Sequence, residues 1–180
     1  FNTYHYTIYV PDNNAVREAI ADGLPTWERI DEIVDSLNTL DEQGLLPNDV
    51  VIEDVQDSLA HIISSFVQYH IQDNSVYIGG GAKNGSFETS TMNEETLAFY
   101  RLNVQCDNRN ITITDVMGNV RHVVTRDPSL YNIMTRVYLF NTSDVKSATQ
   151  IETSSFALVH LIDSFYFWGF SNILLLLYNL

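Results

Sequence analysis

The sequence predicts an α+β fold in which the helices come early in the chain and most of the strands follow them. Two observations support this prediction. After one opening strand, apolar residues recur at helical spacing as far as Tyr69 and His70. From Ile71 onward, alternating segments rich in β-branched and aromatic residues take over. Helices and strands that are segregated in this way favour an α+β fold over a doubly wound sheet.

The first predicted elements are a strand at residues 4–10 and a short helix at residues 15–20. The strand is rich in Tyr, Thr, Ile and Val, and it stops at Pro11 because proline has no N–H to donate to a sheet. The Asp-Asn-Asn run at residues 12–14 can accept hydrogen bonds from the free N–H groups of the helix. These residues are therefore expected to cap it.

Two longer amphipathic helices are predicted to follow. Pro25 suits the first turn of the earlier helix, because the N–H that proline lacks has no partner there, and Gly44 ends that helix. Its apolar face consists of Trp27, Ile30, Ile33, Val34, Leu37 and Leu40. The apolar face of the later helix consists of Val55, Leu59, Ile62, Ile63, Phe66 and Val67. The acidic residues of the earlier helix fall between its apolar positions, on a face that we expect to be solvated.

The rest of the chain is predicted to be strands joined by short turns. The strand-like segments are residues 75–78, 87–91, 97–106, 110–115, 120–125, 137–140 and 159–167. The Met-Gly-Asn turn at residues 117–119 favours a hairpin. The glycine-rich run at residues 79–86 is expected to be a flexible hairpin loop. A phosphate-binding loop would need its lysine after the last glycine and a helix after that, but Lys83 precedes Gly85 and strand-like residues follow.

The charge balance argues against two classes of partner. Nine Lys and Arg residues against 23 Asp and Glu residues give a formal net charge of −14. Nucleic acids and anionic lipid surfaces are bound through Lys and Arg, so neither is expected as a partner. The excess acid favours solubility and is compatible with cations or basic partners, but it specifies none.

The sequence predicts no catalytic residue, no metal site and no cofactor, and hence no enzyme. Cys106 is the only cysteine, and it lies in an alternating stretch, so it is expected to be a small core residue. None of the five histidines is paired at the i,i+4 spacing of a zinc protease helix: His5, His61, His70, His122 and His160. Carboxylates are plentiful, but an acid–base pair is defined in space, so their number does not indicate a hydrolase.

The end of the chain is unusually apolar. Residues 165–178 make a stretch of 14 residues interrupted by Gly, Ser and Asn, whereas a membrane-spanning helix needs about 20 apolar residues. We expect residues 168–180 to form a tail that packs on the protein or faces a partner, with a membrane anchor as the alternative. Left exposed, such a tail would favour self-association.

Three segments, taken together, resemble the fasciclin-like adhesion domain. Residues 6–16, YTIYVPDNNAV, are similar to the first box of that family, in which a strand runs through a proline into a capped helix; that proline is Pro11 here. Residues 66–71, FVQYHI, are similar to the Tyr-His motif that ends the family's central helix. Residues 148–163, which end in HLID, are similar to the second box.

The resemblance covers residues 1–167 and implies a β-sheet wedge with a helical layer. It implies structural roles for the motif residues rather than catalytic ones. His70 would belong to a hydrogen-bond network that holds the helical layer to the sheet, with Tyr69 packed beside it. His160 and Asp163 would fix the final strand.

The resemblance also implies a function, namely a non-catalytic module for cell adhesion or protein interaction. The LPTWE sequence at residues 24–28 resembles members from Bacteroidetes-type bacteria, where such domains are exported and are often surface lipoproteins. We therefore expect an extracytoplasmic location, at the bacterial outer-membrane surface or in the periplasm. The expected partner is a protein or glycan at the cell surface, with any membrane tether lying outside this sequence.

Two rival functions stay open. Aromatic residues make up 12% of the chain and could stack on sugars, which would suit a surface protein that binds or processes glycans. A hydrolase that uses scattered carboxylates is the third class. The chain also departs from the family pattern: the usual N-terminal helical segment is missing, Val16 stands where Phe is usual, and Ser164 replaces a common Gly.

Overall fold

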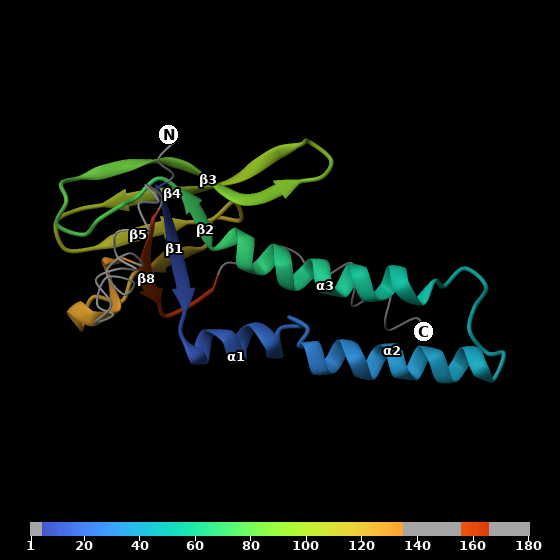
Figure 1. The fold of residues 1–180 in the computed structure, drawn as a ribbon. Coiled ribbons are helices and arrows are strands. Elements are labelled where there is room, and N and C mark those ends of the chain that lie inside the picture. Colours follow the sequence, from blue (N-terminus) through green and yellow to red (C-terminus); the bar gives the residue numbers. More distant parts are fainter. Residues whose placement is uncertain (1–4, 135–155, 166–180) are drawn as a thin grey trace, which may run out of the picture. The chain divides into compact units, whose positions relative to one another are not determined.

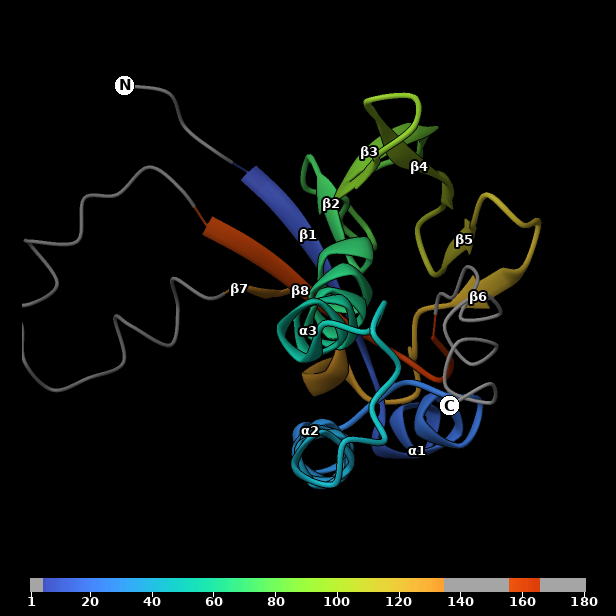
Figure 2. The same ribbon diagram turned by 90° about the vertical axis from the view of Figure 1, so that its right-hand side faces the viewer.

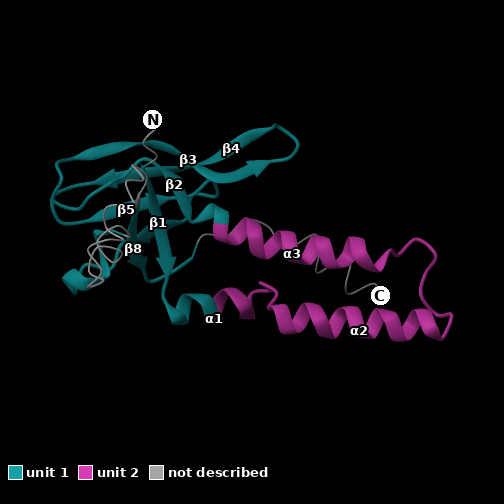
Figure 3. Ribbon diagram, viewed as in Figure 1, with its two compact units in different colours: residues 1–16, 68–168 teal, residues 17–67, 169–180 magenta. Residues whose placement is uncertain are grey.

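The computed structural model describes residues 5–134 and 156–165 (Figure 1). The chain divides into two compact units (Figure 3). Unit 1 comprises residues 1–16 and 68–168, and unit 2 comprises residues 17–67 and 169–180. The predicted α+β class is confirmed, because the helices and most of the strands occupy separate stretches of the chain.

The described elements follow one another with little alternation between helix and strand. The helices are α1 (Asn13–Ala21), α2 (Trp27–Glu42) and α3 (Ile52–Tyr69), and a 3-10 turn, η1, covers Pro128–Leu130. The strands are β1 (His5–Pro11), β2 (Ile71–Asp73), β3 (Lys83–Asn93), β4 (Ala98–Cys106), β5 (Ile111–Thr114), β6 (Val120–His122), β7 (Ile133–Met134) and β8 (Phe156–Ile162).

The described strands of unit 1 form a single eight-stranded sheet in the order β6-β5-β4-β3-β2-β1-β8-β7. Neighbouring strands are antiparallel except β1 and β8, which run parallel. Just past β6, Val123 forms a bridge with Ile162, and the N–H of Val124 donates to the carbonyl oxygen of Leu161 at 2.8 Å. These contacts tie the β6 side of the sheet back to β8, so the sheet curls around its own core (Figure 2).

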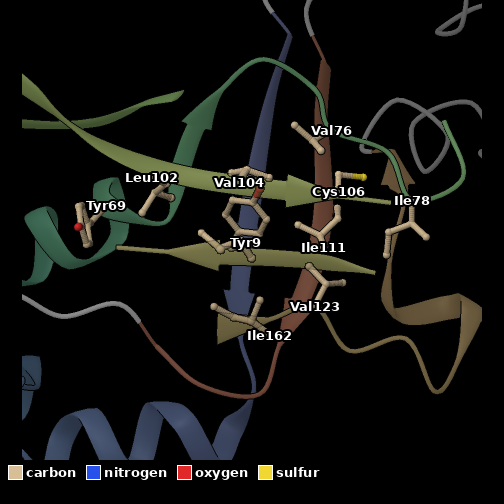
Figure 4. Close-up of a cluster of buried hydrophobic side chains, with 11 residues drawn as sticks. Tyr9, Tyr69, Val76, Ile78, Leu102, Val104, Cys106, Ile111, Val123 and Ile162 are labelled. Carbon is tan, nitrogen blue, oxygen red and sulfur yellow. The ribbon is translucent and has the colours of Figure 1, made fainter. Parts of the chain in front are cut away.

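The hydrophobic core of unit 1 lies inside this curl (Figure 4). Its buried members come from both halves of the sheet: Tyr9, Tyr69, Val76, Ile78, Leu102, Val104, Cys106, Ile111, Ile113, Val123 and Ile162. In β4, residues 102, 104 and 106 are buried while 101, 103 and 105 are exposed, which is the alternation that the sequence predicts for a half-buried strand. Cys106 is a buried core residue, as expected.

The helix ends of unit 2 follow local sequence signals. The side chain of Thr26 accepts a hydrogen bond from the N–H of Arg29 at 3.1 Å, so Thr26 is the N-cap of α2. Pro25 therefore precedes the cap and is not in the first turn, which corrects the prediction. Gly44 ends α2 in a Schellman arrangement with φ 69°: its N–H donates to Asp41, and the N–H of Leu45 donates to Leu40.

Several predicted strands differ from the observed ones. Residues 75–78 were expected to be a strand, but they form no strand in the structure, whereas the short strand β2 just before them was not predicted. The glycine-rich run was expected to be a loop as far as residue 86, but β3 already begins at Lys83. The final strand starts and ends earlier than predicted, at Phe156 and Ile162. The strand predicted at residues 137–140 lies outside the described residues.

Candidate functional site

The three motif segments meet in three neighbouring strands of unit 1. β2 begins at Ile71, the last residue of the Tyr-His segment, β1 contains residues 6–11 of the first box, and β8 contains residues 156–162 of the second box. The sheet order places them as β2-β1-β8, and we call them the motif strands. In the register of these strands, Tyr9 of β1 lies opposite His160 of β8, and Ile8 lies opposite Ile71 of β2.

Pro11 lies at the exit from β1, where strand gives way to helix. It is opposite Ile162, and the next N–H, that of Asp12, donates to the carbonyl oxygen of Ile162 at 2.9 Å. The carboxylate of Asp12 accepts from the N–H groups of Asn14 and Ala15, both at 2.9 Å. Asp12 is therefore the member of the Asp-Asn-Asn run that caps α1.

His160 is fully buried and hydrogen-bonded on both ring nitrogens. Its Nε2 lies 2.9 Å from the carbonyl oxygen of Val76, and its Nδ1 accepts from the N–H of Asn132 at 3.2 Å. A carbonyl can only accept and a backbone N–H can only donate, so the ring is neutral with its proton on Nε2. Burial lowers the pKa of His160 to about 4. The ring also stacks on Tyr9, with centroids 6.0 Å apart and an interplanar angle of 22°.

Residues 74–78 are held by three side chains rather than by a strand ladder: Thr7 of β1, Asn132 just before β7 and His160 of β8. Thr7 donates from Oγ1 to the carbonyl oxygen of Asn74 at 2.7 Å and accepts from the N–H of Val76 at 3.2 Å. Asn132 accepts from the N–H of Ile78 at 3.0 Å and donates to its carbonyl oxygen at 2.8 Å. Together with His160, these contacts satisfy five backbone groups, at Asn74, Val76 and Ile78, in a segment that forms no strand.

The other buried polar groups beside His160 also belong to the packing of the sheet. Tyr9 donates from its hydroxyl to Oε1 of Gln72 at 3.0 Å, and burial raises the pKa of Tyr9 well above its ordinary value. Tyr69 accepts from the N–H of Val116 at 3.3 Å and meets Tyr100 edge to face at 5.8 Å. Burial raises the pKa of Tyr69 to about 12. Both tyrosines therefore stay protonated at neutral pH and act as hydrogen-bonding core residues.

The remaining two motif residues occupy contrasting positions. His70 is buried, and its carbonyl oxygen accepts from the N–H of Tyr9 at 2.9 Å, which ties the end of the Tyr-His motif to β1. Asp163 is exposed and lies one residue past β8. The structure gives it no hydrogen bond to another described residue.

The motif strands and the end of α3 hold a structural network. His160, Tyr9 and Tyr69 are buried, and each uses its polar atoms in hydrogen bonds within the fold. Within residues 5–134 and 156–165, no three His, Cys, Asp or Glu side chains are grouped so that they could hold a metal ion. Among these same residues, no helix is both long and apolar enough to cross a membrane.

A different region, the end of the β3–β4 hairpin, exposes apolar side chains around a hydrogen-bonded turn. Met92, Leu97 and Phe99 are 43%, 71% and 47% exposed, and we call these three residues the hairpin tip. Asn93 accepts at Oδ1 from the N–H groups of Glu95 and Thr96, both at 2.9 Å, and its amide donates to the hydroxyl of Tyr100. The turn is therefore built by defined hydrogen bonds.

Leu97 has a left-handed backbone conformation that its sequence does not predict. It was predicted to open a strand, but it closes the turn with φ 54°, and its N–H donates to the carbonyl oxygen of Asn93 at 2.8 Å. L-residues other than Gly, Asn and Asp rarely adopt this left-handed region. A leucine gives no sequence signal for it. The pair Met92 and Phe99, which face each other across β3 and β4, was not singled out either.

No protein-family model matches the chain, and no curated protein matches it. The fasciclin-like fold therefore stays a prediction that depends on the motif residues themselves.

Proposed function

We propose that this chain is a non-catalytic, extracytoplasmic module for adhesion or protein interaction, with a fasciclin-like β-sheet wedge. The meeting of the three motif segments in neighbouring strands supports the resemblance from which this proposal starts. The resemblance also supports an exported location at a bacterial surface or in the periplasm. We further propose that the hairpin tip is the contact surface of the module.

One observation supports this contact surface above the others: Leu97 is the most exposed of the tip residues and has a left-handed backbone. That conformation costs a leucine about 1–2 kcal/mol, and exposing the side chain gains nothing for folding. Asn or Gly would suit the turn better on both counts. An apolar residue held at this position is best explained by a partner that covers it.

The interaction role is also favoured over catalysis by the state of the buried groups. A general base or nucleophile has to reach a substrate, yet His160 and Tyr9 are fully buried and hydrogen-bonded within the fold. Their shifted pKa values have a structural cause, namely burial.

Photo-cross-linking from the tip would test the proposal. A benzophenone amino acid is placed at position 97 of the intact chain, the protein is applied to cells of the producing organism, and light is used to fix contacts. We expect one discrete surface protein to be captured, and an excess of the unlabelled chain to suppress its capture. The matched control carries the same group at Asn103, an exposed position on β4. Equal or absent labelling from the two positions would overturn the proposed contact surface.

One observation favours the rival glycan-binding function. Trp27 opens α2 and is 61% exposed, and an open indole face is a common platform for a sugar ring. A glycan array probed with the intact chain and with Trp27→Ala tests this rival. Signals that depend on Trp27 would favour glycan binding over a protein partner.

A further inference from the structure

The turn between β5 and β6 exposes apolar side chains, as the hairpin tip does. Val116 and Met117 in this turn are 47% and 68% exposed. The turn is fixed by the carboxylate of Asp115, whose Oδ1 accepts from the N–H groups of Met117 at 2.9 Å and Asn119 at 2.8 Å. Asp115 itself is buried. A backbone held from within the fold therefore presents two apolar side chains to solvent.

Direct contacts join this turn to the hairpin tip. The N–H of Val116 donates to the hydroxyl of Tyr69 at 3.3 Å, and the ring of Tyr69 meets that of Tyr100 edge to face. The hydroxyl of Tyr100 accepts in turn from the amide of Asn93, which builds the turn of the hairpin tip. Because β4 and β5 are antiparallel, the end of β5 and the start of β4 lie at the same end of the sheet. The two turns are therefore neighbours.

The exposed charges at this end of the sheet are acidic. Glu94 and Glu95 are exposed in the turn of the hairpin tip. The nearby basic residues are used within the fold, because Arg101 forms an ion pair with Glu88 and Arg121 donates from Nε to a backbone carbonyl oxygen. A molecule that approaches the two turns therefore meets apolar side chains beside two carboxylates.

We propose that Val116, Met117 and the hairpin tip form one continuous docking surface, and that its occupant is a protein with an apolar patch beside Lys or Arg side chains. The proposal rests on the proposed function, because the hairpin tip belongs to both. Single exposed apolar residues are common, but five at one end of a sheet mark a contact surface. The apolar tail expected at residues 168–180 lies outside the described residues and is not part of this surface.

The charges favour this occupant over two others. A second copy of the chain would bring the same glutamates and a net charge of −14 to the contact, so like charges would meet. An anionic bilayer would also present negative charge to Glu94 and Glu95. The Lys or Arg side chains of a protein partner complement these carboxylates, while its apolar patch covers the side chains of the two turns.

Photo-cross-linking from the β5–β6 turn tests whether the surface is continuous. The benzophenone amino acid is placed at position 117 of the intact chain and used on the same cells as at position 97. We expect both positions to label the same protein, at peptides that contain Lys or Arg. The control carries the group at Asn108, which is exposed at the opposite end of β5, and should not label that protein.

The two positions separate this proposal from the proposed function. Labelling from position 97 together with no labelling, or labelling of a different protein, from position 117 overturns the continuous surface and leaves the hairpin tip as the contact surface. No labelling from either position overturns both. Adducts at twice the mass of the chain, or flotation with vesicles of phosphatidylcholine and phosphatidylglycerol, would also overturn the proposal.

The contribution of the glutamates is measured by charge substitution. Glu94→Gln and Glu95→Gln are combined in the chain that carries the photoreactive group at position 97, at protein concentrations below saturation. We expect labelling of the partner to fall at least about threefold, because two exposed ion pairs are lost. The control combines Glu28→Gln and Asp31→Asn on α2, which removes the same charge from exposed residues and should leave labelling unchanged. Equal labelling of the partner by the two variants would overturn the assignment of a basic partner.

Discussion

The imidazole of His160 is hydrogen-bonded through Nε2 to the carbonyl oxygen of Val76, 84 positions earlier in the chain, at 2.9 Å. This contact joins β8 to a segment that forms no strand. Since Nδ1 accepts at the same time from Asn132, one side chain satisfies two backbone groups inside the protein. His160 therefore links segments of unit 1 that lie far apart in the sequence.

Removing the His160 ring should destabilise unit 1 strongly. His160→Ala leaves the carbonyl of Val76 and the N–H of Asn132 without their partner and opens a cavity beside Tyr9. We expect the free energy of unfolding to fall by about 2–4 kcal/mol in urea titrations followed by circular dichroism. His122→Ala is the control, because His122 is exposed, and it should change the free energy by less than about 0.5 kcal/mol. Equal effects of the two variants would contradict the structural role of His160.

The same residue should make stability depend on pH between about 6.5 and 4. The pKa of His160 is lowered from 6.5 to about 4 in the folded protein, so the unfolded chain binds a proton in this range and the folded chain does not. Stability is therefore complete above pH 6.5 and is lost as the pH falls toward 4, by about 3 kcal/mol. Asp107 and Asp127, whose pKa values are lowered by hydrogen bonds, would act only at lower pH. Urea midpoints at pH 7.5 and 4.5 measure the effect, and His160→Phe should reduce it.

Replacing Leu97 should separate folding from the proposed interaction. Leu97→Asn suits the left-handed backbone at φ 54°, so we expect it to stabilise the chain by up to about 1 kcal/mol while weakening capture of the surface partner. Leu97→Ala keeps the backbone strain but removes most of the side chain, and it serves as the matched control. Loss of stability in Leu97→Asn would argue that the leucine packs within the fold.

The assignment of the cap of α1 can be tested by single substitutions. Asp12→Ala removes the carboxylate that accepts from Asn14 and Ala15, and we expect a loss of about 1 kcal/mol in the free energy of unfolding. Asn13→Ala is the control, because Asn13 is exposed and is already the first residue of the helix. A larger loss in Asn13→Ala than in Asp12→Ala would show that the cap is wrongly assigned.

The side chain of Asn132 should contribute more to the free energy of unfolding than its backbone conformation does. Asn132→Gly keeps access to φ 53° but removes both hydrogen bonds to Ile78, so a loss of about 1–3 kcal/mol is expected. Asn74 also has a positive φ, 70°, and its amide bonds only to the exposed Asp73. Asn74→Gly should therefore be close to neutral in the same urea titration.

Much of the fold could be predicted because local pattern and burial agree. The apolar faces of α2 and α3 recur at helical spacing, and β4 alternates because one face meets the core and the other meets solvent. Residues 75–78 alternate in the same way without forming a strand, since Thr7, Asn132 and His160 supply the hydrogen bonds. Those partners lie far away in the sequence, where a local pattern cannot detect them.

The candidate contact surface was harder to predict than the buried motif residues. His160 and His70 stand in recognisable sequence contexts, and both are buried in the structure. The hairpin tip depends on a turn that places a leucine in a left-handed conformation. Leucine has no preference for that conformation, so the sequence does not predict it. Exposure of Met92 and Phe99 follows from how far the hairpin extends past β2, which pairs with β3 only at Thr89. The length of this extension is set by strand pairing in the folded sheet, which a local sequence pattern does not show.

The parallel pairing of β1 with β8 has a consequence for synthesis on the ribosome. His5 lies opposite Phe156, so β1 cannot pair with β8 until a segment about 150 residues later in the chain has been translated. At about 5–20 residues per second, this delay lasts roughly 8–30 s, during which one edge of β1 has no strand beside it. The helices depend on local contacts and can form in that interval, whereas the sheet closes only after residue 162 has emerged. Nascent chains stalled before the second box should therefore associate with other strands through the unpaired edge of β1. Chaperones should bind such chains more than the completed protein.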